Sequence, residues 1–351
     1  MCIALLTTAH PDYALILLDN RDEFLLRPTS RPHWWKHPRT GQPVLSSRDL
    51  QRAEKGTWMG VTKTGLWAVL TNYREADDSR KAGAGAGTAV RGTKSRGGMV
   101  TAWLAGLGGG VGEGVQQLVR EDGVKGVGGF SMVCGKLRGK GSGVAMVSNR
   151  AGRADEVPLA ACQRGETLGL SNTAFDAEVA WPKVELGTRL LRDAVRHAVE
   201  AGSSEDRLIE DLFRLLDTDT FPACEPGVPF EEMARLLRHT IFVPELGDRG
   251  HREAMRAARA RGKAEWAEDQ GSLKAVEETP FGRQAEEEEV AAAANGFETG
   301  TYGTQRQTMM LVDLGGRVKF VERALWDGNG NSIPRGEGDA VFEFQIEGWA
   351  D

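Results

Sequence analysis

The residues best suited to chemistry stand at the start of the chain, where Cys2 follows the initiator methionine. Cysteine is the strongest nucleophile among the ordinary side chains, and it needs only a base or a lowered pKa. Removal of Met1, which is usual before a small residue, would leave Cys2 with a free α-amine beside its thiol. That amine has a reference pKa of about 7.7–8.0, so it can act as the base directly or through water. Cys2 is therefore a candidate N-terminal nucleophile.

A predicted hairpin brings further polar residues to Cys2. Two short apolar runs flank residues 7–12, which contain Pro and Asp and have the composition of a turn. Paired residue numbers should then sum to about 21 to 23, because the turn fixes the register of a hairpin. In that register Cys2 faces residues 19–21. The guanidinium of Arg21 and the carboxylate of Asp22 are therefore expected near the thiol.

Each polar residue of this neighbourhood has a chemical role that it could fill. Arg21 could stabilise the thiolate or bind a substrate carboxylate, and Asp22 could hold the new amine or orient Arg21. Asn72 and Asn172 each end a strand-like run, and side-chain amides can serve as oxyanion donors. The predicted catalytic residues are therefore Cys2, Arg21, Asp22, Asn72 and Asn172. No cofactor-binding or metal-binding residue is predicted.

Simpler interpretations of the same residues remain open. A cysteine at the start of a strand is ordinarily a small buried hydrophobic residue. The sequence Asn-Arg-Asp-Glu after a strand is ordinarily a polar loop, or the cap of a helix starting at Phe24. The pair Trp34-Trp35 could line a pocket or cover the edge of a core. The glycine-rich tracts lack a P-loop motif, and no CxxCH motif marks a haem attachment site.

Composition excludes several classes of protein. The 351 residues are 40% hydrophobic and carry a net charge of -6, which argues against nucleic acid as the main partner. The apolar runs are far shorter than the roughly 20 residues that span a bilayer, and the N-terminus lacks the pattern of a secretory signal. Four cysteines without CxxC pairing argue against a zinc site or a disulfide scaffold, and they favour a reducing intracellular compartment.

The elements that must position these residues are strands, then helices, then strands. Strand-like runs fill much of the first half, helical periodicity covers 184–201, 206–217 and 230–239, and three β patterns cover 302–313, 317–325 and 340–346. Because strands and helices do not alternate, the pattern favours an α+β fold with antiparallel sheets. One domain over 1–351 is predicted. Glycine-rich or charged flexible insertions are expected at about 77–94, 106–114 and 245–300.

An ordered series of short motifs runs along the chain. They include Met1-Cys2-Ile3, Asn20-Arg21-Asp22-Glu23, Gly56-Thr57-Trp58, Leu70-Thr71-Asn72, Gly169-Leu170-Ser171-Asn172, Trp181-Pro182-Lys183 and Tyr302-Gly303-Thr304. This series resembles the NRDE family, also called the Transport and Golgi organization protein 2 family, over nearly the whole chain apart from the insertions. Many members carry Arg after the Tyr-Gly-Thr motif, where this chain has Gln305 followed by Arg306.

The resemblance implies a four-layer αββα sandwich of the N-terminal nucleophile hydrolase type. In such sites an N-terminal Cys, an Arg and an Asp from the following strand, and two Asn residues act together. By motif, these are Cys2, Arg21, Asp22, Asn72 and Asn172 here. The family has been linked to Golgi organization, protein secretion, lipid and acyl-CoA metabolism, mitochondria and haem trafficking. A cytoplasmic protein with Golgi or mitochondrial association is therefore expected.

Three functions from different classes remain as expectations. In the first, Cys2 attacks an amide or an acyl-CoA-like thioester. In the second, the protein is no enzyme and binds or carries haem or an acyl chain in the same pocket, so that haem is a ligand and no cofactor is needed. In the third, the charged stretch 245–300 docks a protein partner.

Overall fold

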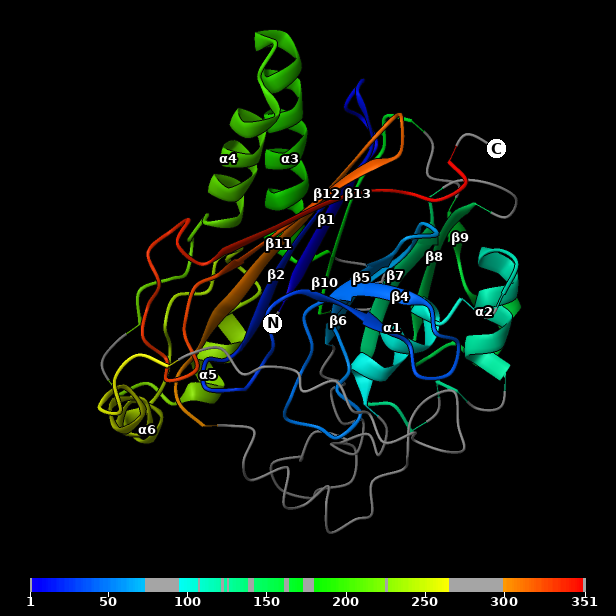
Figure 1. The fold of residues 1–351 in the computed structure, drawn as a ribbon. Coiled ribbons are helices and arrows are strands. Elements are labelled where there is room, and N and C mark those ends of the chain that lie inside the picture. The colour runs from blue at the N-terminus through cyan, green and yellow to red at the C-terminus, as the bar shows by residue number, and fades with distance from the viewer. Residues whose placement is uncertain are drawn as a thin grey trace.

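The computed structural model describes residues 2–72, 95–106, 108–120, 123–124, 126–137, 142–160, 164–172, 180–224, 227–264 and 299–349. Within these ranges the named strands form two antiparallel sheets (Figure 1). The six-stranded sheet has the order β10 (Thr167–Ser171), β1 (Ile3–Thr7), β2 (Tyr13–Phe24), β11 (Tyr302–Asp313), β12 (Arg317–Ala324) and β13 (Asp339–Gln345). The seven-stranded sheet has the order β3 (His33–Lys36), β4 (Pro43–Ser46), β5 (Met59–Thr62), β6 (Leu66–Asn72), β7 (Phe130–Lys136), β8 (Gly143–Ser148) and β9 (Leu159–Ala160).

The described helices cover the outer faces of the two sheets and one end of the molecule. They are α1 (Arg96–Leu104), α2 (Val111–Val119), α3 (Pro182–Ala201), α4 (Glu205–Leu216), α5 (Phe230–Leu236) and α6 (Arg249–Arg259). Figure 1 shows α3 and α4 beside the six-stranded sheet, and α1 and α2 beside the seven-stranded sheet.

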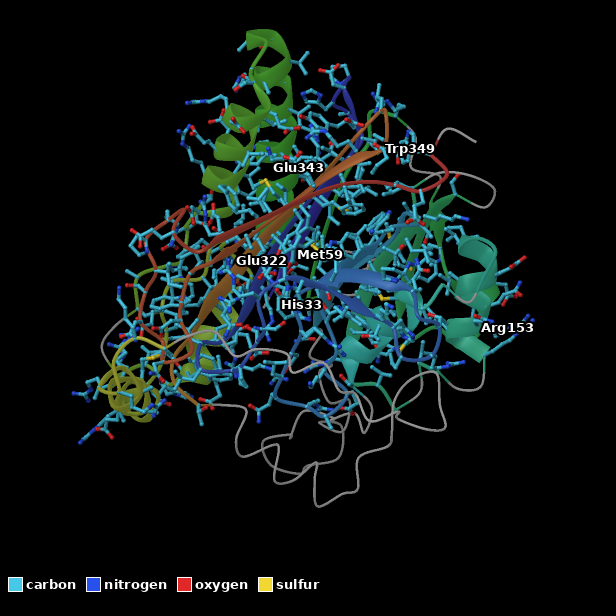
Figure 2. All side chains as sticks on the ribbon, viewed as in Figure 1. His33, Met59, Arg153, Glu322, Glu343 and Trp349 are labelled. Carbon is cyan, nitrogen blue, oxygen red and sulfur yellow. The ribbon has the colours of Figure 1, made fainter. Side chains whose placement is uncertain are left out.

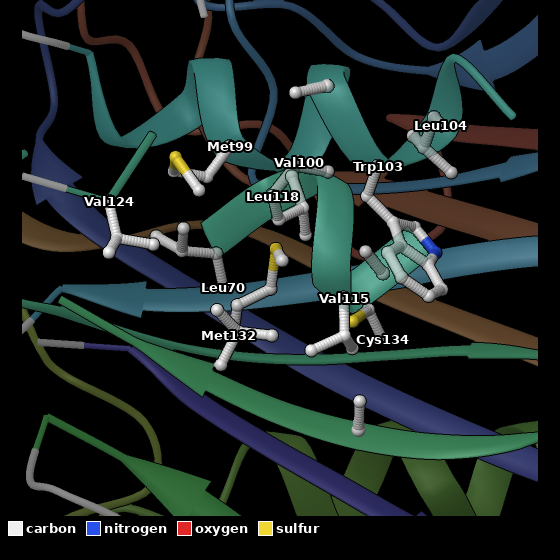
Figure 3. Close-up of a cluster of buried hydrophobic side chains, with 14 of the residues drawn as sticks. Leu70, Met99, Val100, Trp103, Leu104, Val115, Leu118, Val124, Met132 and Cys134 are labelled. Atoms are coloured by element: carbon white, nitrogen blue, oxygen red, sulfur yellow. The ribbon is translucent and has the colours of Figure 1, made fainter. Parts of the chain in front are cut away.

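Three clusters of buried side chains define the layers. Val100 and Leu118 of α1 and α2 pack on the seven-stranded sheet (Figure 3). Leu17 and Trp67 belong to the cluster between the two sheets. A third cluster joins Leu191 of α3 and its neighbours to the other face of the six-stranded sheet. The layer order is therefore αββα, and the predicted α+β four-layer sandwich with antiparallel sheets is confirmed.

The first hairpin has the predicted register. Ile3 pairs with Asn20 and Thr7 with Ile16, so the paired numbers sum to 23. Extending this register by one residue places Cys2 opposite Arg21, as expected. Strand β2 continues to Phe24, so the Asn-Arg-Asp-Glu sequence lies inside a buried strand. It is neither a polar loop nor a helix cap, because β11 pairs with β2 along this stretch.

Tight packing fixes the position of α3 against this hairpin. A Cβ atom on Gly169 of β10 would lie 2.9 Å from the side chains of Thr188 and Val184, so only glycine allows this approach. Helix α3 begins at Pro182, where proline is favoured. It ends before Gly202, which adopts a left-handed conformation with φ 59. The first turn of α3 is thereby held beside the start of the chain.

The Trp34-Trp35 pair lies in β3, an edge strand of the seven-stranded sheet that pairs with β4. Trp35 joins the core beneath α1 and α2, and Trp34 packs against the core between the sheets. The pair therefore covers a core edge, which was one of the two interpretations of this sequence.

The predicted insertions lie partly outside the described residues. Segment 77–94 falls entirely outside them. Within 106–114, helix α2 begins at Val111, because Val111, Val115 and Leu118 form an apolar stripe that packs on the core. Within 245–300, the described part ends at 264, resumes at 299 and includes α6. No helix in the described part of the chain is long and apolar enough to cross a membrane.

Candidate functional site

Cys2 lies at the edge of the sandwich core, held from two sides. The residue is 5% exposed, and Sγ donates a long hydrogen bond of 3.8 Å to the carbonyl oxygen of Asp22. Its own carbonyl oxygen accepts a hydrogen bond of 2.8 Å from Ser171 Oγ. Burial raises the pKa of the Cys2 thiol to about 11. The backbone around Cys2 is therefore fixed, while the thiol is mostly protonated near neutral pH.

Asp22 and Lys183 form a fully buried pair beside Cys2. Asp22 Oδ1 accepts a hydrogen bond of 2.7 Å from Thr304 Oγ1. Asp22 Oδ2 lies 3.9 Å from Lys183 Nζ, and both side chains are 0% exposed. Burial raises the pKa of Asp22 and lowers the pKa of Lys183. Each group nevertheless favours the charged form of the other, because opposite charges attract strongly away from water.

Arg21 takes a different direction from Asp22, because neighbouring residues of a strand point to opposite faces. Its guanidinium lies 4.3 Å from the ring centroid of Trp58, and Nη1 donates to Gln305 Oε1. Gln305 in turn donates to the carbonyl oxygens of Leu25 and Arg27 at 3.2 and 2.9 Å. Arg21 thus shares the face of Cys2 between the two sheets, but the neighbouring side chains hold it in place.

The two asparagines meet where the sheets come together. Asn172 Nδ2 donates to the carbonyl oxygen of Asn72, and Asn172 Oδ1 lies 3.2 Å from Ser171 Oγ. Thr71 Oγ1 donates to the carbonyl oxygen of Ser171 at 2.9 Å, which joins β6 to β10. Because Ser171 also contacts the carbonyl of Cys2, Asn172 and the backbone carbonyl of Asn72 are linked to the candidate nucleophile. Cys2, Asp22, Asn72 and Asn172 are thus joined by hydrogen bonds, whereas Arg21 is placed opposite Cys2 by the strand register.

A β-bulge in β11 determines which of Gln305 and Arg306 contacts Arg21. Thr304 pairs with Asp22 and Arg306 pairs with Arg21, so Gln305 is the extra residue of β11. Gln305 therefore contacts Arg21. Arg306 lies on the face between the sheets, donating to Thr29 Oγ1 at 2.9 Å and to the Trp326 carbonyl at 3.2 Å.

Behind Arg21, charged and polar side chains form two rows across the face between the sheets. One row contains Arg21 and Arg306, and the next contains Asp19, Thr308 and Glu322, as the strand pairing requires. Arg306 Nε lies 3.8 Å from Glu322 Oε1, and Ser47 Oγ lies 2.6 and 2.7 Å from the two Glu322 oxygens. Glu322 lies on β12 (Figure 2). Burial lowers the pKa of Arg306 to about 9 and raises the pKa values of Asp19 and Glu322.

Sequence reasoning missed Ser171, Lys183 and Thr304 as members of the site. Ser171 and Thr304 act through contacts that only the paired strands reveal. For Lys183 a signal existed, since Pro182 predicts the start of a helix. A lysine in the first turn is unfavourable beside the positive end of the helix dipole. Such a residue invites a search for a carboxylate partner.

Within the described ranges, no group of three or more His, Cys, Asp and Glu side chains is arranged to hold a metal ion. A cavity of about 590 Å³ lies between residues 219–224, residues 227–228, α5 and α6, and none of the five predicted site residues lines it.

Fold and site together define an αββα sandwich protein with a buried cysteine at the start of its first hairpin. The family model described as "Transport and Golgi organisation 2" matches residues 1–327. The chain belongs to this family, as its motifs suggested.

Two relatives that carry the name of this family support the assignment. The Transport and Golgi organization protein 2 homolog of Bos taurus is 30% identical over 222 residues, which are 62% of this chain and 70% of that protein. The Homo sapiens homolog is 26% identical over 321 residues, which are 90% of this chain and 88% of that protein. Penicillin V acylase from Agrobacterium tumefaciens, a solved structure, aligns with a TM-score of 0.36 and 10% identity, covering 98% of this chain and 86% of that one.

Proposed function

We propose that this protein is a hydrolase that cleaves an amide or a thioester by acyl transfer through Cys2. The observation that carries the proposal is the convergence of Cys2 with Asp22, with 3.8 Å between Sγ and the Asp22 carbonyl oxygen. Removal of Met1 would add a free amine to this buried neighbourhood. The site would then hold a nucleophile, a base and a carboxylate in a rigid hairpin.

The raised pKa of the thiol explains why a base is required. With a pKa of about 11, little Cys2 thiolate exists at neutral pH. The α-amine of Cys2 would be attached to the same residue and has a reference pKa of about 7.7–8.0. It can accept the thiol proton as the sulfur attacks, which is the ordinary requirement for general base catalysis. Asp22 stabilises the resulting ammonium.

The reaction balances without a cofactor. The Cys2 sulfur forms a bond to the carbonyl carbon, and its proton passes to the amine. The bond to the leaving amine or thiol then breaks, and the leaving group takes that proton. Water attacks the acyl group on Cys2, which releases a carboxylic acid and restores the thiol. Side-chain amides of Asn72 and Asn172 are proposed to donate hydrogen bonds to the oxyanion in both steps.

Mass spectrometry can test the proposal on the intact protein and on the Cys2 peptide. Intact protein should lack the mass of Met1, because only then does Cys2 carry the amine. During turnover of a reactive amide or thioester from a panel of acyl compounds, rapid acid quenching should trap an acyl group on the Cys2 peptide. Hydrolysis by protein that retains Met1, or turnover in which the acyl group never appears on Cys2, would contradict the mechanism.

The cavity beside Phe221, Val228 and α6 supports a second candidate, a carrier of haem or an acyl chain. Its volume of about 590 Å³ lies in the usual range for small-molecule sites. Phe221, Val228 and Leu246 give it apolar walls, while Arg252 and Arg256 line it as cations. This lining suits an apolar ligand that carries a carboxylate.

If the carrier function holds, filling the cavity should weaken binding without involving Cys2. Val228→Trp is expected to raise the Kd for haem or a fatty acid by about tenfold or more, because the larger side chain occupies the volume. Cys2→Ala, whose side chain is not part of the lining, should leave Kd unchanged. Calorimetric or fluorescence titration measures both. An equal loss with Cys2→Ala, or no binding to the wild type, would remove this candidate.

A further inference from the structure

Lys183 is a buried cation for which packing offers no explanation. Its side chain is 0% exposed, and lysine is almost never fully buried unless it is paired. It lies in the first turn of α3, where the helix dipole disfavours a positive charge. Burial also lowers the pKa of Lys183. A neutral residue of similar length, such as methionine, would fill this position at a lower electrostatic cost.

The groups that face Lys183 belong to the candidate site. Asp22 of β2 lies 3.9 Å away, and both Asp22 and Cys2 favour the charged form of the lysine. The ring centroid of Trp181 lies 5.8 Å from Nζ. The backbone N–H of Lys183 donates to the carbonyl oxygen of Arg238 at 3.1 Å, which fixes the start of the helix. The lysine therefore approaches the site from the face of β2 opposite Arg21.

We propose that Lys183 is a positioning residue for acyl transfer, which keeps the Asp22 carboxylate ionised and directed toward the α-amine of Cys2. This inference rests on the proposed function of Cys2. Thr304 holds one carboxylate oxygen of Asp22 at 2.7 Å, and Lys183 attracts the other. With both oxygens fixed, the carboxylate can accept a hydrogen bond from the amine without reorganising. Strand β2 thus contributes to the site from both of its faces. Arg21 lies on the face between the sheets, and Asp22 lies with Lys183 on the face that packs against α3.

The direction of the expected effect follows from the charges. Burial raises the pKa of Asp22, and the amino group at the start of the chain, then the cation of Lys183, then the hydrogen bond from Thr304 oppose that rise. Without the cation, the pKa of Asp22 rises further, and the carboxylate form is lost at a higher pH. The same cation favours the Cys2 thiolate, since it attracts the negative charge. Loss of Lys183 should therefore weaken both the carboxylate and the nucleophile.

The experiment compares Lys183→Met with Lys183→Arg. Lys183→Met should move the acidic limb of the kcat/KM profile to higher pH. A shift of about one pKa unit would lower kcat/KM about tenfold at pH values on the acidic side of that limb, since one pKa unit is a tenfold change in ionisation. Lys183→Arg retains the charge and should restore the profile at least in part. The melting temperature of each variant is measured alongside, so that a loss through unfolding is recognised by circular dichroism.

A second readout does not depend on turnover. The rate at which iodoacetamide alkylates Cys2, measured on the Cys2 peptide by mass spectrometry over a pH series, should fall in Lys183→Met and remain close to wild type in Lys183→Arg. In an Asp22→Asn background, Lys183→Met should no longer move the acidic limb, because the coupled carboxylate is gone.

The outcomes separate this inference from the proposed function. A folded Lys183→Met protein with an unchanged profile and unchanged Cys2 alkylation overturns the role of Lys183. An equal shift of the limb in the Asp22→Asn background also overturns it, since the effect would not pass through Asp22. If the wild type shows no Cys2-dependent turnover, the proposed function fails, and the alkylation series alone decides whether Lys183 is coupled to Cys2.

Discussion

Cys2→Ala is expected to lower kcat for amide or thioester cleavage by about 10⁴-fold or more, the usual result of removing a covalent nucleophile. The alanine lacks the atom that accepts the acyl group, so only binding and oxyanion stabilisation remain. The fold should survive, because the thiol contributes a long hydrogen bond of 3.8 Å. The bond from Ser171 reaches the backbone carbonyl of residue 2, and alanine keeps it.

Cys2→Ser provides the matched control for this prediction. Serine keeps the size, the α-amine and the contacts of the backbone, but its hydroxyl is a much weaker nucleophile than a thiolate. Both variants should lose turnover, while circular dichroism and thermal unfolding report native proteins. Both should also lose Met1, because alanine and serine are small. Wild-type rates in folded Cys2→Ala protein would show that the hydrolysis occurs elsewhere.

The position of Cys2 opposite Arg21 was accessible from sequence because the register of a hairpin depends on local rules. A Pro-containing turn between two apolar runs fixes a register, and that register places residue 2 opposite residue 21. For residues 20–23 the structure differs from what the sequence suggests. Taken alone, the polar sequence 20–23 is typical of a loop or of the cap of a helix starting at Phe24. It forms a strand because β11 supplies partners for its buried polar groups, including Thr304 and Gln305.

Contacts between distant parts of the chain could not be predicted in this way. Asn172 meets Asn72 because Thr71 joins the two sheets at that point, and no spacing in the sequence encodes that meeting. The Asp22–Lys183 pair needs the close approach of α3, which Gly169 permits. The family motifs named these residues without giving their geometry. Secondary-structure propensity predicts single helices and strands, whereas the site forms only when these elements pack together.

The two rows of charge between the sheets show why Arg21 and Arg306 have different tasks. Arg21 lies opposite the candidate nucleophile, with its guanidinium over Trp58. Arg306 lies one strand further away and pairs with Glu322 at 3.8 Å. Ser47 also contacts Glu322, and Arg306 donates to Thr29 and to the Trp326 carbonyl. The Arg306–Glu322 pair therefore has a structural role. Its substitution should therefore change stability more than chemistry.

Arg306→Met is expected to destabilise the protein by about 3–5 kcal/mol, the usual cost of breaking a buried ion pair. The loss should grow with pH. Burial already raises the pKa of Glu322 in the folded state, and Arg306 opposes that rise. Without the guanidinium the folded pKa rises further, so folding retains a proton that the unfolded chain releases. The deficit relative to wild type is then smallest below the pKa of Glu322 and increases as the pH rises through it.

Urea unfolding at several pH values measures this deficit, and two controls test its cause. Arg306→Met combined with Glu322→Gln removes both charges, so most of the lost stability should return and the pH dependence should flatten. Arg335→Met breaks an exposed pair with Asp217, whose atoms lie 3.0 Å apart, and should cost less than about 1 kcal/mol. A deficit that is independent of pH and persists in the double variant would mean that Arg306 stabilises the sandwich through packing and its hydrogen bonds to Thr29 and Trp326, rather than through the charge of Glu322.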